Sequence, residues 1–577
     1  MFEIYFLSFL TSVYFISAGI FFSNNILDIK IKNETNIFKI ALYGCIFLSF
    51  FGLLLNYFIN LSKSINIIIL ITFLIYLIIS QKKYLLKKVF TSSILIAGCC
   101  SFLIISDNTY RPDAGLYHLP YINILNTEKI IIGISNIHFR FGHTSIIQYL
   151  SAINNNWIFS DNSILLPTAI IYICFLFYLI YEIKFSTDKN LIFFNFLILS
   201  FLCLKLNRYS DFGNDAPAHI YYFLLTSIAL KYYKKLEITN MGEIGILSAY
   251  LVYNKITLFL GSLVTIIFLI FKKKIYFFKI KPIIFILIFT FIFFTKNFLI
   301  SGCAAFPIKN TCVSNFFWYD LGSNRGTNAE KTMFENEAWT KGWNDQINNK
   351  KNYEQYLSDY NWIKIWLDNH GKRTLNKLAP FLIFIIFIYI FILLTKNNYK
   401  IDKKKFNKYD EKNFILSLII LNFIGILMWF LKFPVFRYGY SYPILFIILL
   451  VVLVCSNKIK VINIYTFKKK INYILIFLIL ILFTKNFIRI AKNYDANYNH
   501  APWPKIYSED KKNLKKENIP VLINDEIIYY YSSNSTCYFN TAPCTHIDFF
   551  QNSSNQVKLK RKFGYKIFYF DRENFIK

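Results

Sequence analysis

The sequence predicts an all-α polytopic membrane protein of about 14 transmembrane helices, with a small extracytoplasmic α/β domain at its C-terminal end. Apolar runs of about 20 residues, the length that crosses a bilayer as a helix, recur along most of the 577 residues. Backbone groups in lipid must be satisfied within the segment, which favours helices. A membrane barrel would need strands of alternating polarity, which these runs lack.

The chain begins with apolar runs that fix the first spans. We expect helices near 4–22, 38–60, 65–81 and 89–106, and the first lacks the basic start and cleavage site of a signal peptide. Three spans should follow up to residue 235. After them come a helical hairpin over 242–253 and 256–271, a span near 282–300, and four more spans before residue 488.

The net charge of +31 comes from lysines that cluster in short blocks between apolar runs. Examples are Lys272–Lys274, Lys403–Lys405 and Lys468–Lys470. Such blocks mark cytoplasmic loops, so the charge indicates membrane orientation rather than a nucleic-acid partner. The segments 107–162, 301–373 and 489–577 then lie on the outer side.

These segments define the predicted domains. A transmembrane domain, 1–488, contains a catalytic loop at 107–162 and a long outer loop at 301–373. In the long loop, aromatic residues from Tyr353 to Leu367 have helical spacing, and the helix either lies in the membrane interface or packs on the rest of the loop. The C-terminal domain, 489–577, contains predicted strands at Val521–Tyr531 and Tyr565–Asp571.

Four of the ten cysteines fall in predicted outer segments, as Cys303 with Cys312 and Cys537 with Cys544. Close pairs on an outer face favour two disulfides in an oxidising compartment. Zinc binding is the weaker alternative, because the spacings do not match common zinc motifs.

Ionisable residues are scarce within the spans and gather at their outer ends. Those in the catalytic loop are Asp113, His118, His138, Arg140 and His143, with Tyr117 beside them. Later ones are Asp211, Asp215, His219, Lys255 and Arg437. If these ends converge, the carboxylates can act as a general base and the cations can hold a phosphate.

This arrangement resembles the GT-C superfamily of polytopic membrane glycosyltransferases. The matching stretches are Asp113-Ala-Gly-Leu-Tyr-His118, the acidic pair Asp211 and Asp215, and the hairpin around Lys255. The chain is also similar to a group of uncharacterised large bacterial membrane proteins. The similarity lies in the residues just named and in two further stretches, Asn136-x-His-x-Arg-x-Gly142 and Ala542–Thr545. Three more spans precede the acidic loop here than in many GT-C enzymes.

The resemblance implies a location in a bacterial inner membrane and inverting transfer of a sugar from a polyprenyl-phosphate donor. The acceptor is a glycan, lipid or protein on the periplasmic side. Asp113, Asp211 and Asp215 are the candidate catalytic carboxylates. The candidate substrate-binding residues are Tyr117, His118, His138, Arg140, His143, His219, Lys255 and Arg437. We expect no required cofactor, although paired aspartates suit Mg²⁺ or Mn²⁺.

Each candidate also has a purely structural explanation. Asp113 could cap a helix that opens at Ala114, and Asp211 and Asp215 could cap the seventh span. Lys255 could extend from a turn towards water, and Arg437 could anchor the membrane interface. The histidines could be ordinary loop residues.

Two other functions remain open. A polysaccharide polymerase or ligase would use lipid-linked oligosaccharide and would not need the Asp113 motif. A transporter or flippase of lipid-linked sugars would be expected to line its path with charged residues, which are scarce within the spans.

Overall fold

The structure is a computed structural model of the full chain. It describes residues 2–80, 82–106, 113–143, 145–159, 161–205, 212–234, 238–272, 279–319, 329–343, 353–394, 408–495, 518–523, 526–532, 537, 542–545 and 557–570. Asp211, one of the three predicted catalytic carboxylates, lies outside the described residues.

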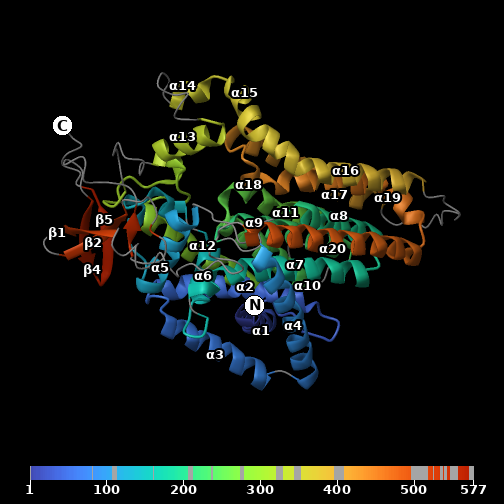
Figure 1. Ribbon diagram of the computed structural model, residues 1–577, viewed down its shortest axis with the longest axis horizontal. Coiled ribbons are helices and arrows are strands. Elements are labelled where there is room, and N and C mark those ends of the chain that lie inside the picture. Colours follow the sequence, from blue (N-terminus) through green and yellow to red (C-terminus); the bar gives the residue numbers. More distant parts are fainter. Residues whose placement is uncertain are drawn as a thin grey trace.

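Long helices form the body of the protein (Figure 1). The first ten are α1 (Phe2–Asn25), α2 (Ile37–Asn56), α3 (Lys63–Ser80), α4 (Lys83–Ser106), α7 (Leu166–Phe185), α8 (Lys189–Lys205), α9 (Asp215–Lys234), α10 (Ile238–Asn254), α11 (Phe259–Lys272) and α12 (Ile280–Ser301). The others are α16 (Lys372–Leu394), α17 (Lys408–Lys432), α19 (Ser441–Val461) and α20 (Ile464–Asp495). Each predicted span coincides with one of these helices.

The protein is a multi-pass membrane protein. Among the described residues, nine helical stretches are long and apolar enough to cross a membrane, and they involve α1, α2, α3, α4, α7, α12, α16, α17 and α20. The remaining helices, α8, α9, α10, α11 and α19, do not meet that standard, so the number of 14 is not confirmed. In α9 the polar side chains Tyr221, Tyr222 and Ser227 lower the hydropathy, and all three are fully buried within the protein.

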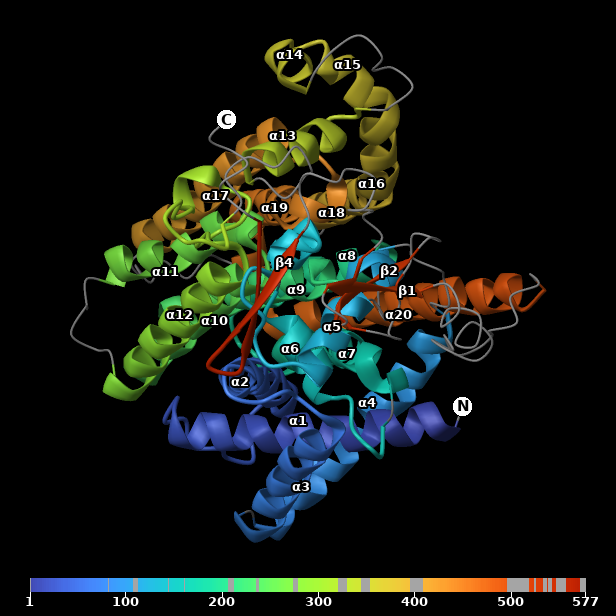
Figure 2. The ribbon, with the colours of Figure 1, turned by 90° about the vertical axis from the view of Figure 1, so that its left-hand side faces the viewer.

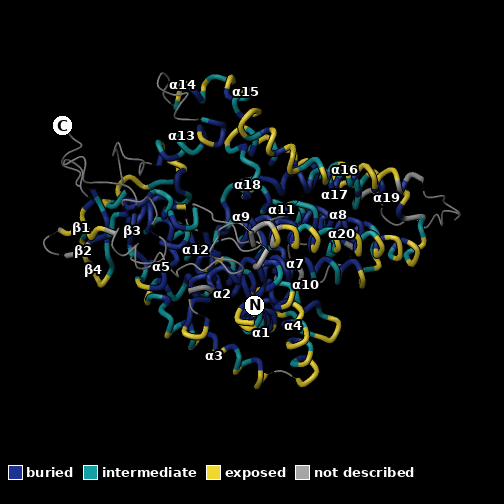
Figure 3. The backbone as a smooth tube through the Cα atoms, viewed as in Figure 1, coloured by how far each residue is buried: buried dark blue, intermediate teal, exposed yellow. Residues whose placement is uncertain are grey.

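The helices differ sharply in how far they are enclosed (Figure 3). The apolar windows of α2 and α7 are 83% buried within the protein, whereas that of α16 is 22% buried. On α16 the side chains of Ile383, Phe387 and Ile390 are exposed. Exposed aliphatic and aromatic side chains on a helix of this length suit contact with lipid tails.

Helices α1 and α2 cross so closely that only glycine fits at the contact. A Cβ on Gly19 would lie 1.9 Å from the carbonyl oxygen of Ile40, and one on Gly44 would lie 1.8 Å from that of Phe15. Small residues allow backbones to approach in this way in membrane bundles.

Short helices connect the long ones at one end of the bundle. Those of the catalytic loop are η1 (Ala114–His118, a π-helix), α5 (Leu119–Thr127), η2 (Ile134–Asn136), η3 (Phe139–His143), α6 (Ile147–Ile153) and η4 (Asp161–Leu165). The later ones are η5 (Ile256–Leu258), η7 (Lys309–Thr311), α13 (Ala329–Thr340), α14 (Tyr353–Ser358), α15 (Trp362–Trp366), η9 (Leu367–Gly371) and α18 (Phe436–Gly439). We call this end of the bundle, with residues 113–159 and the strands, the loop end.

The helix predicted over Tyr353–Leu367 is split into α14 and α15. Tyr356, Trp362 and Trp366 are buried, and both tryptophan rings contact Phe430 of α17. This part of the long outer loop therefore packs on protein, which favours that alternative over a free interfacial helix.

In the described part of the C-terminal segment there are five strands: β1 (Asn518–Ile523), β2 (Glu526–Ser532), β3 (Cys544–Thr545), β4 (Lys558–Lys562) and β5 (Tyr565–Tyr569). They form a β1-β2-β3 sheet and a β4-β5 hairpin. The single strand predicted over Val521–Tyr531 is wrong, because β1 and β2 are antiparallel partners. The overlooked signal is Asn524-Asp525, two residues that favour turns. Helix α20 also extends past the predicted boundary at 488.

The strands lie against the catalytic loop rather than apart from it (Figure 2). The N–H of Phe568 donates to the carbonyl of Ile132 across 2.9 Å, and Lys566 pairs with Glu128 at 2.7 Å. The N–H of Cys537 donates to the carbonyl of Gly115, within η1, across 3.0 Å. The C-terminal segment is therefore part of the support of the loop end.

Both predicted cysteine pairs, Cys303–Cys312 and Cys537–Cys544, are disulfide-bonded in the structure. The six other cysteines are unpaired and lie within the long apolar helices, in keeping with the sequence pattern.

Candidate functional site

Four of the predicted residues converge at the loop end from four separate elements. Asp113 directly precedes η1, and Asp215 is the first residue of α9. Lys255 follows the last residue of α10, and Arg437 lies in α18. Helix ends supply all four, because a charge at the end of a span avoids the apolar interior.

These four side chains form a continuous chain of ion pairs, which we call the charge chain. Nη1 of Arg437 donates to Oδ2 of Asp113 across 2.8 Å, and its Nε lies 3.9 Å from Oδ2 of Asp215. The ammonium group of Lys255 pairs with the other oxygen of Asp215. Two carboxylates thus balance two cations, which allows all four to be largely buried.

The turn that carries Arg437 is held by hydrogen bonds from three other elements. Nε1 of Trp366 donates to the carbonyl of Pro434 across 2.6 Å, and Nε1 of Trp429 donates to that of Val435 across 2.9 Å. Oγ1 of Thr257, in η5, donates to the carbonyl of Tyr438 across 3.1 Å. The backbone at Arg437 is therefore fixed by its surroundings.

The carbonyl oxygen of Arg437 is itself a shared acceptor. Nε2 of His219 lies 3.0 Å from it and Nζ of Lys255 lies 3.1 Å from it. A carbonyl oxygen only accepts hydrogen bonds, so Nε2 of His219 must carry a hydrogen. The other ring nitrogen, Nδ1, lies 2.7 Å from the hydroxyl oxygen of Ser441. His219 is buried and its ring nitrogens contact protein, which gives it a positioning role.

The charge chain sets the protonation of its members. Burial alone raises the pKa of Asp113, but the Arg437 guanidinium and the charge of Arg140 outweigh it, and the net pKa is lower than usual. Burial alone lowers the pKa of Arg437, but Tyr438, Asp215 and Asp113 outweigh it and raise the pKa. Asp113 is therefore ionised at neutral pH.

For three of the four residues, the structural explanation does not match the surroundings. Among the described residues, the Asp113 side chain makes no capping hydrogen bond to η1. Lys255 is buried and paired with Asp215 instead of extending to solvent. Arg437 is directed towards two carboxylates, and only 20% of its side chain is exposed. Asp215 does occupy the first turn of α9, so a capping contribution remains compatible with its position.

Arg140, Tyr117 and His118 lie next to Asp113. The Arg140 guanidinium is 5.0 Å from the centre of the Tyr117 ring, a cation–π arrangement. The rings of Tyr117 and His118 are 4.2 Å apart. Arg140 extends the positive side of the site, because its charge acts on the Asp113 carboxylate.

The other two loop histidines contact aromatic residues. His138 is fully buried, and its Nδ1 accepts a hydrogen bond from the Arg140 N–H across 3.1 Å. His143 is exposed, and its ring packs on Phe306 at 5.3 Å. His138 thus shapes the loop that presents Arg140.

Sequence reasoning missed two aromatic neighbours of Arg437. Its guanidinium lies 5.2 Å from the ring centre of Tyr438 and 5.8 Å from that of Trp339. Tyr438 follows Arg437 directly and could have been found in the Phe-Arg-Tyr-Gly stretch. Trp339 carries no such signal, because it comes from α13 in the long outer loop.

The described site does not fit a divalent metal ion. Among the described residues, no three His, Cys, Asp or Glu side chains gather as a metal would require. The Asp113 and Asp215 carboxylates face cationic side chains, and a metal ion would have to displace both Arg437 and Lys255.

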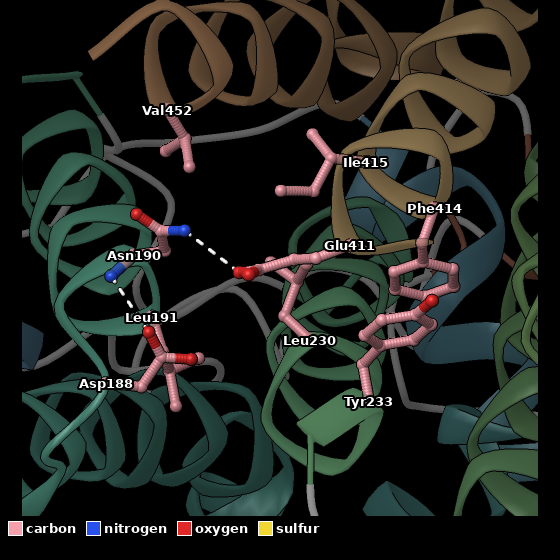
Figure 4. Close-up of a pocket in the computed structure, with 9 residues that line it drawn as sticks. All are labelled: Asp188, Asn190, Leu191, Leu230, Tyr233, Glu411, Phe414, Ile415 and Val452. Atoms are coloured by element: carbon pink, nitrogen blue, oxygen red, sulfur yellow. Dashed lines mark hydrogen bonds between the residues drawn. The ribbon is translucent and has the colours of Figure 1, made fainter. Parts of the chain in front are cut away.

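A separate pocket lies at the opposite end of the bundle (Figure 4). Its polar lining comes from Asp188, Asn190 and Glu411, and Nδ2 of Asn190 donates to Glu411 across 2.9 Å. It contains none of the predicted site residues. Its carboxylates and amide bond to one another, as expected of groups that stabilise the contact between α8 and α17.

Comparison with known proteins identifies one relationship. A family model described as "Domain of unknown function (DUF8201)" matches residues 1–444. The match includes every residue of the charge chain and stops within α19. Searches of curated proteins and of solved structures give no significant match.

Proposed function

Because the chain belongs to the DUF8201 family, which carries no assigned function, we propose an activity from the site itself: transfer of a sugar from a polyprenyl-phosphate donor to an acceptor hydroxyl. The single observation that carries the proposal is the charge chain Asp113–Arg437–Asp215–Lys255. It combines an ionised carboxylate with two cations at the end of a membrane-embedded bundle.

Asp113 is the proposed general base. Its lowered pKa keeps it ionised, and its position before η1 leaves 31% of the side chain exposed. A carboxylate that is ionised and reachable can take the proton of an acceptor hydroxyl as the oxygen attacks the anomeric carbon.

Arg437 and Lys255 are the proposed groups for the leaving phosphate. As the glycosidic bond breaks, negative charge grows on the lipid phosphate, and fixed cations stabilise that charge in the transition state. The Arg437 guanidinium can donate two parallel hydrogen bonds to a phosphate. Arg140, beside Asp113, is a third cation within the same region.

The pairing of Arg437 with Asp113 suggests an order of events. A lipid phosphate competes with Asp113 for the Arg437 guanidinium, because both are anions that accept hydrogen bonds from the same N–H groups. When Arg437 turns to the phosphate, Asp113 loses its strongest partner and its pKa rises. Donor binding then both holds the leaving group and releases a stronger base.

The bundle offers a route for the lipid part of such a donor. Helices α16 and α17, which flank the α18 turn, expose Ile383, Phe387 and Leu431. A polyprenyl chain is as apolar as these side chains and can remain in the bilayer while its phosphate reaches the charge chain. We also propose that the site lies on the outer, periplasmic side of a bacterial inner membrane.

The proposal is tested by a transfer assay. The purified full-length protein in lipid nanodiscs receives a panel of radiolabelled polyprenyl-phosphate sugars and a cell-envelope extract as the source of acceptor hydroxyls. Release of lipid phosphate is measured for wild type and Asp113→Asn. Asp188→Asn is the matched control, because it makes the same chemical change at the opposite end and asparagine keeps the cap on Asn190.

Release by wild type and Asp188→Asn, with none by Asp113→Asn, supports the enzyme class and the base together. Equal release by Asp113→Asn keeps the class but moves the catalytic carboxylate to Asp215 or Asp211. No release from any donor contradicts the proposal. Lipid-linked oligosaccharides then test the polymerase or ligase alternative, and vesicle transport of lipid-linked sugars tests the transporter or flippase.

A further inference from the structure

Trp339 is the one exposed residue in an otherwise buried stretch of α13. Ala338 is 0%, Thr340 1% and Lys341 4% exposed, whereas 45% of Trp339 is exposed. An alanine, a threonine and a lysine are therefore enclosed by protein while the largest apolar side chain among them meets solvent. Single exposed apolar side chains are common on protein surfaces, so the exposure of Trp339 bears on function only through the groups that lie beside it.

The position of Trp339 is fixed by its buried neighbours. Glu337 pairs with Lys341 at 2.7 Å and with Lys432, at the end of α17, at 3.2 Å. Oγ1 of Thr340 donates to the carbonyl of Lys432 across 3.4 Å. The long outer loop is thereby attached to the same turn that carries Arg437.

This attachment places the indole beside the charge chain. The Arg437 guanidinium lies 5.8 Å from the Trp339 ring centre, while Nη1 of the same group binds Asp113. The same ring also lies 6.2 Å from the His370 ring, and 45% of Trp339 is still exposed, so indole surface remains for a ligand held by Arg437. The site thus has a charged part and an apolar aromatic part in direct contact.

We infer that Trp339 is the surface on which the sugar ring of a polyprenyl-phosphate sugar stacks. The inference rests on the proposed function and names a residue that binds the transferred group. A sugar is joined to its phosphate through one oxygen, so a phosphate at Arg437 brings the sugar ring next to the indole. The C–H face of a pyranose gains dispersion contact with an aromatic ring, and its hydroxyls remain available for hydrogen bonds.

The inference is tested by separating the phosphate and sugar contributions to binding. Full-length protein in nanodiscs is titrated with the methyl ester of polyprenyl phosphate, which serves as the bare lipid phosphate, and with polyprenyl-phosphate hexoses of the same chain length. Both lipids are phosphodiesters with a single negative charge, so they differ in the sugar and not in charge. The variants are Trp339→Ala, Trp339→Phe and Arg437→Gln. Trp157→Ala is the matched control, because Trp157 is 68% exposed and donates to Ser64 of α3 instead of contacting the charge chain.

Wild type should bind a sugar-bearing lipid roughly tenfold more tightly than the bare lipid phosphate, in the range of one aromatic contact. Trp339→Ala should lose that preference while it still binds the bare lipid phosphate. Trp339→Phe should keep most of the preference, and Trp157→Ala all of it. Thermal melting should be unchanged in Trp339→Ala, because the exposed indole contributes little to folding.

The inference is overturned if Trp339→Ala keeps the preference, or if wild type has none although it binds the bare lipid phosphate. Either result leaves the proposed phosphate site intact. If wild type binds neither lipid, the proposed function fails and this inference fails with it. A loss of preference in Trp157→Ala as well would indicate a general effect of exposed tryptophans in the membrane interface and would also overturn the inference.

Discussion

Nη1 of Arg437 donates a 2.8 Å hydrogen bond to Oδ2 of Asp113, a residue 324 positions earlier in the chain. The contact joins the start of the 113–159 segment to the turn between α17 and α19. It pairs a carboxylate that the proposed reaction needs as a base, so under that proposal the contact opens before proton transfer.

Asp113→Asn should lower sugar transfer by roughly 10²–10⁴-fold, the usual contribution of a general base. The amide keeps the size of the side chain and can still accept from Arg437, so the fold should persist. Initial rates at saturating donor, together with thermal melting, measure both effects. A melting temperature that falls along with the rate would point to a structural role instead.

Removal of the Arg437 charge should shift the pH dependence of transfer. The folded-state pKa of Asp113 is lowered, so its contribution to stability is present above the unfolded pKa and is lost as pH falls through the folded value. In Arg437→Gln, burial acts without that cation and the pKa of Asp113 rises. The acid limb of kcat/KM should therefore move to higher pH.

The control for this profile is Arg373→Gln, since Arg373 is an exposed arginine at the start of α16. Its acid limb should coincide with that of wild type. An unchanged acid limb in Arg437→Gln would mean that a group other than Asp113 controls the acid limb of kcat/KM.

Loss of the Cys537–Cys544 disulfide should reduce transfer without unfolding the helices. Cys537 supports η1 through its hydrogen bond to Gly115, two residues after Asp113. Small displacements of a reacting group can lower rates by up to about 100-fold. The double variant Cys537→Ser/Cys544→Ser should therefore be less active than Cys303→Ser/Cys312→Ser, at similar melting temperature. Equal activities of the two variants would show that the disulfide does not support the site.

A buried ion pair at the opposite end should matter for stability rather than transfer. Lys39 of α2 and Glu243 of α10 lie 2.8 Å apart, and Tyr232 of α9 donates to Glu243 across 2.7 Å. Lys39→Met leaves a buried carboxylate without its cation, which costs roughly 3–5 kcal/mol. Adding Glu243→Gln should recover much of that loss, as measured by unfolding in detergent.

The matched control is Lys279→Met, which removes the partner of Asp28 from a more exposed pair. Its effect on unfolding should be small, because water replaces the lost contact. A loss of stability equal to that of Lys39→Met would show that burial of the ion pair does not determine the cost of removing its cation.

Local patterns in the sequence were sufficient to place the helices and the polar ends. Asp113, Lys255 and Arg437 could each be singled out because they follow or precede apolar runs. The partners could not be predicted, since the pairing of Arg437 with Asp113 depends on how distant spans pack. Trp339 was missed for the same reason, and His219 was predicted as a binding residue although its ring nitrogens contact Ser441 and the Arg437 carbonyl.

The contacts of the strand segment have a consequence for how the protein matures. Gly115 and Ile132 are bonded by Cys537 and Phe568, which leave the ribosome more than 400 residues later. Domains generally fold as they emerge, from the N-terminal side. The helical bundle can therefore assemble before its loop end is complete, and a nascent chain released before residue 537 should be inserted in the membrane yet lack activity.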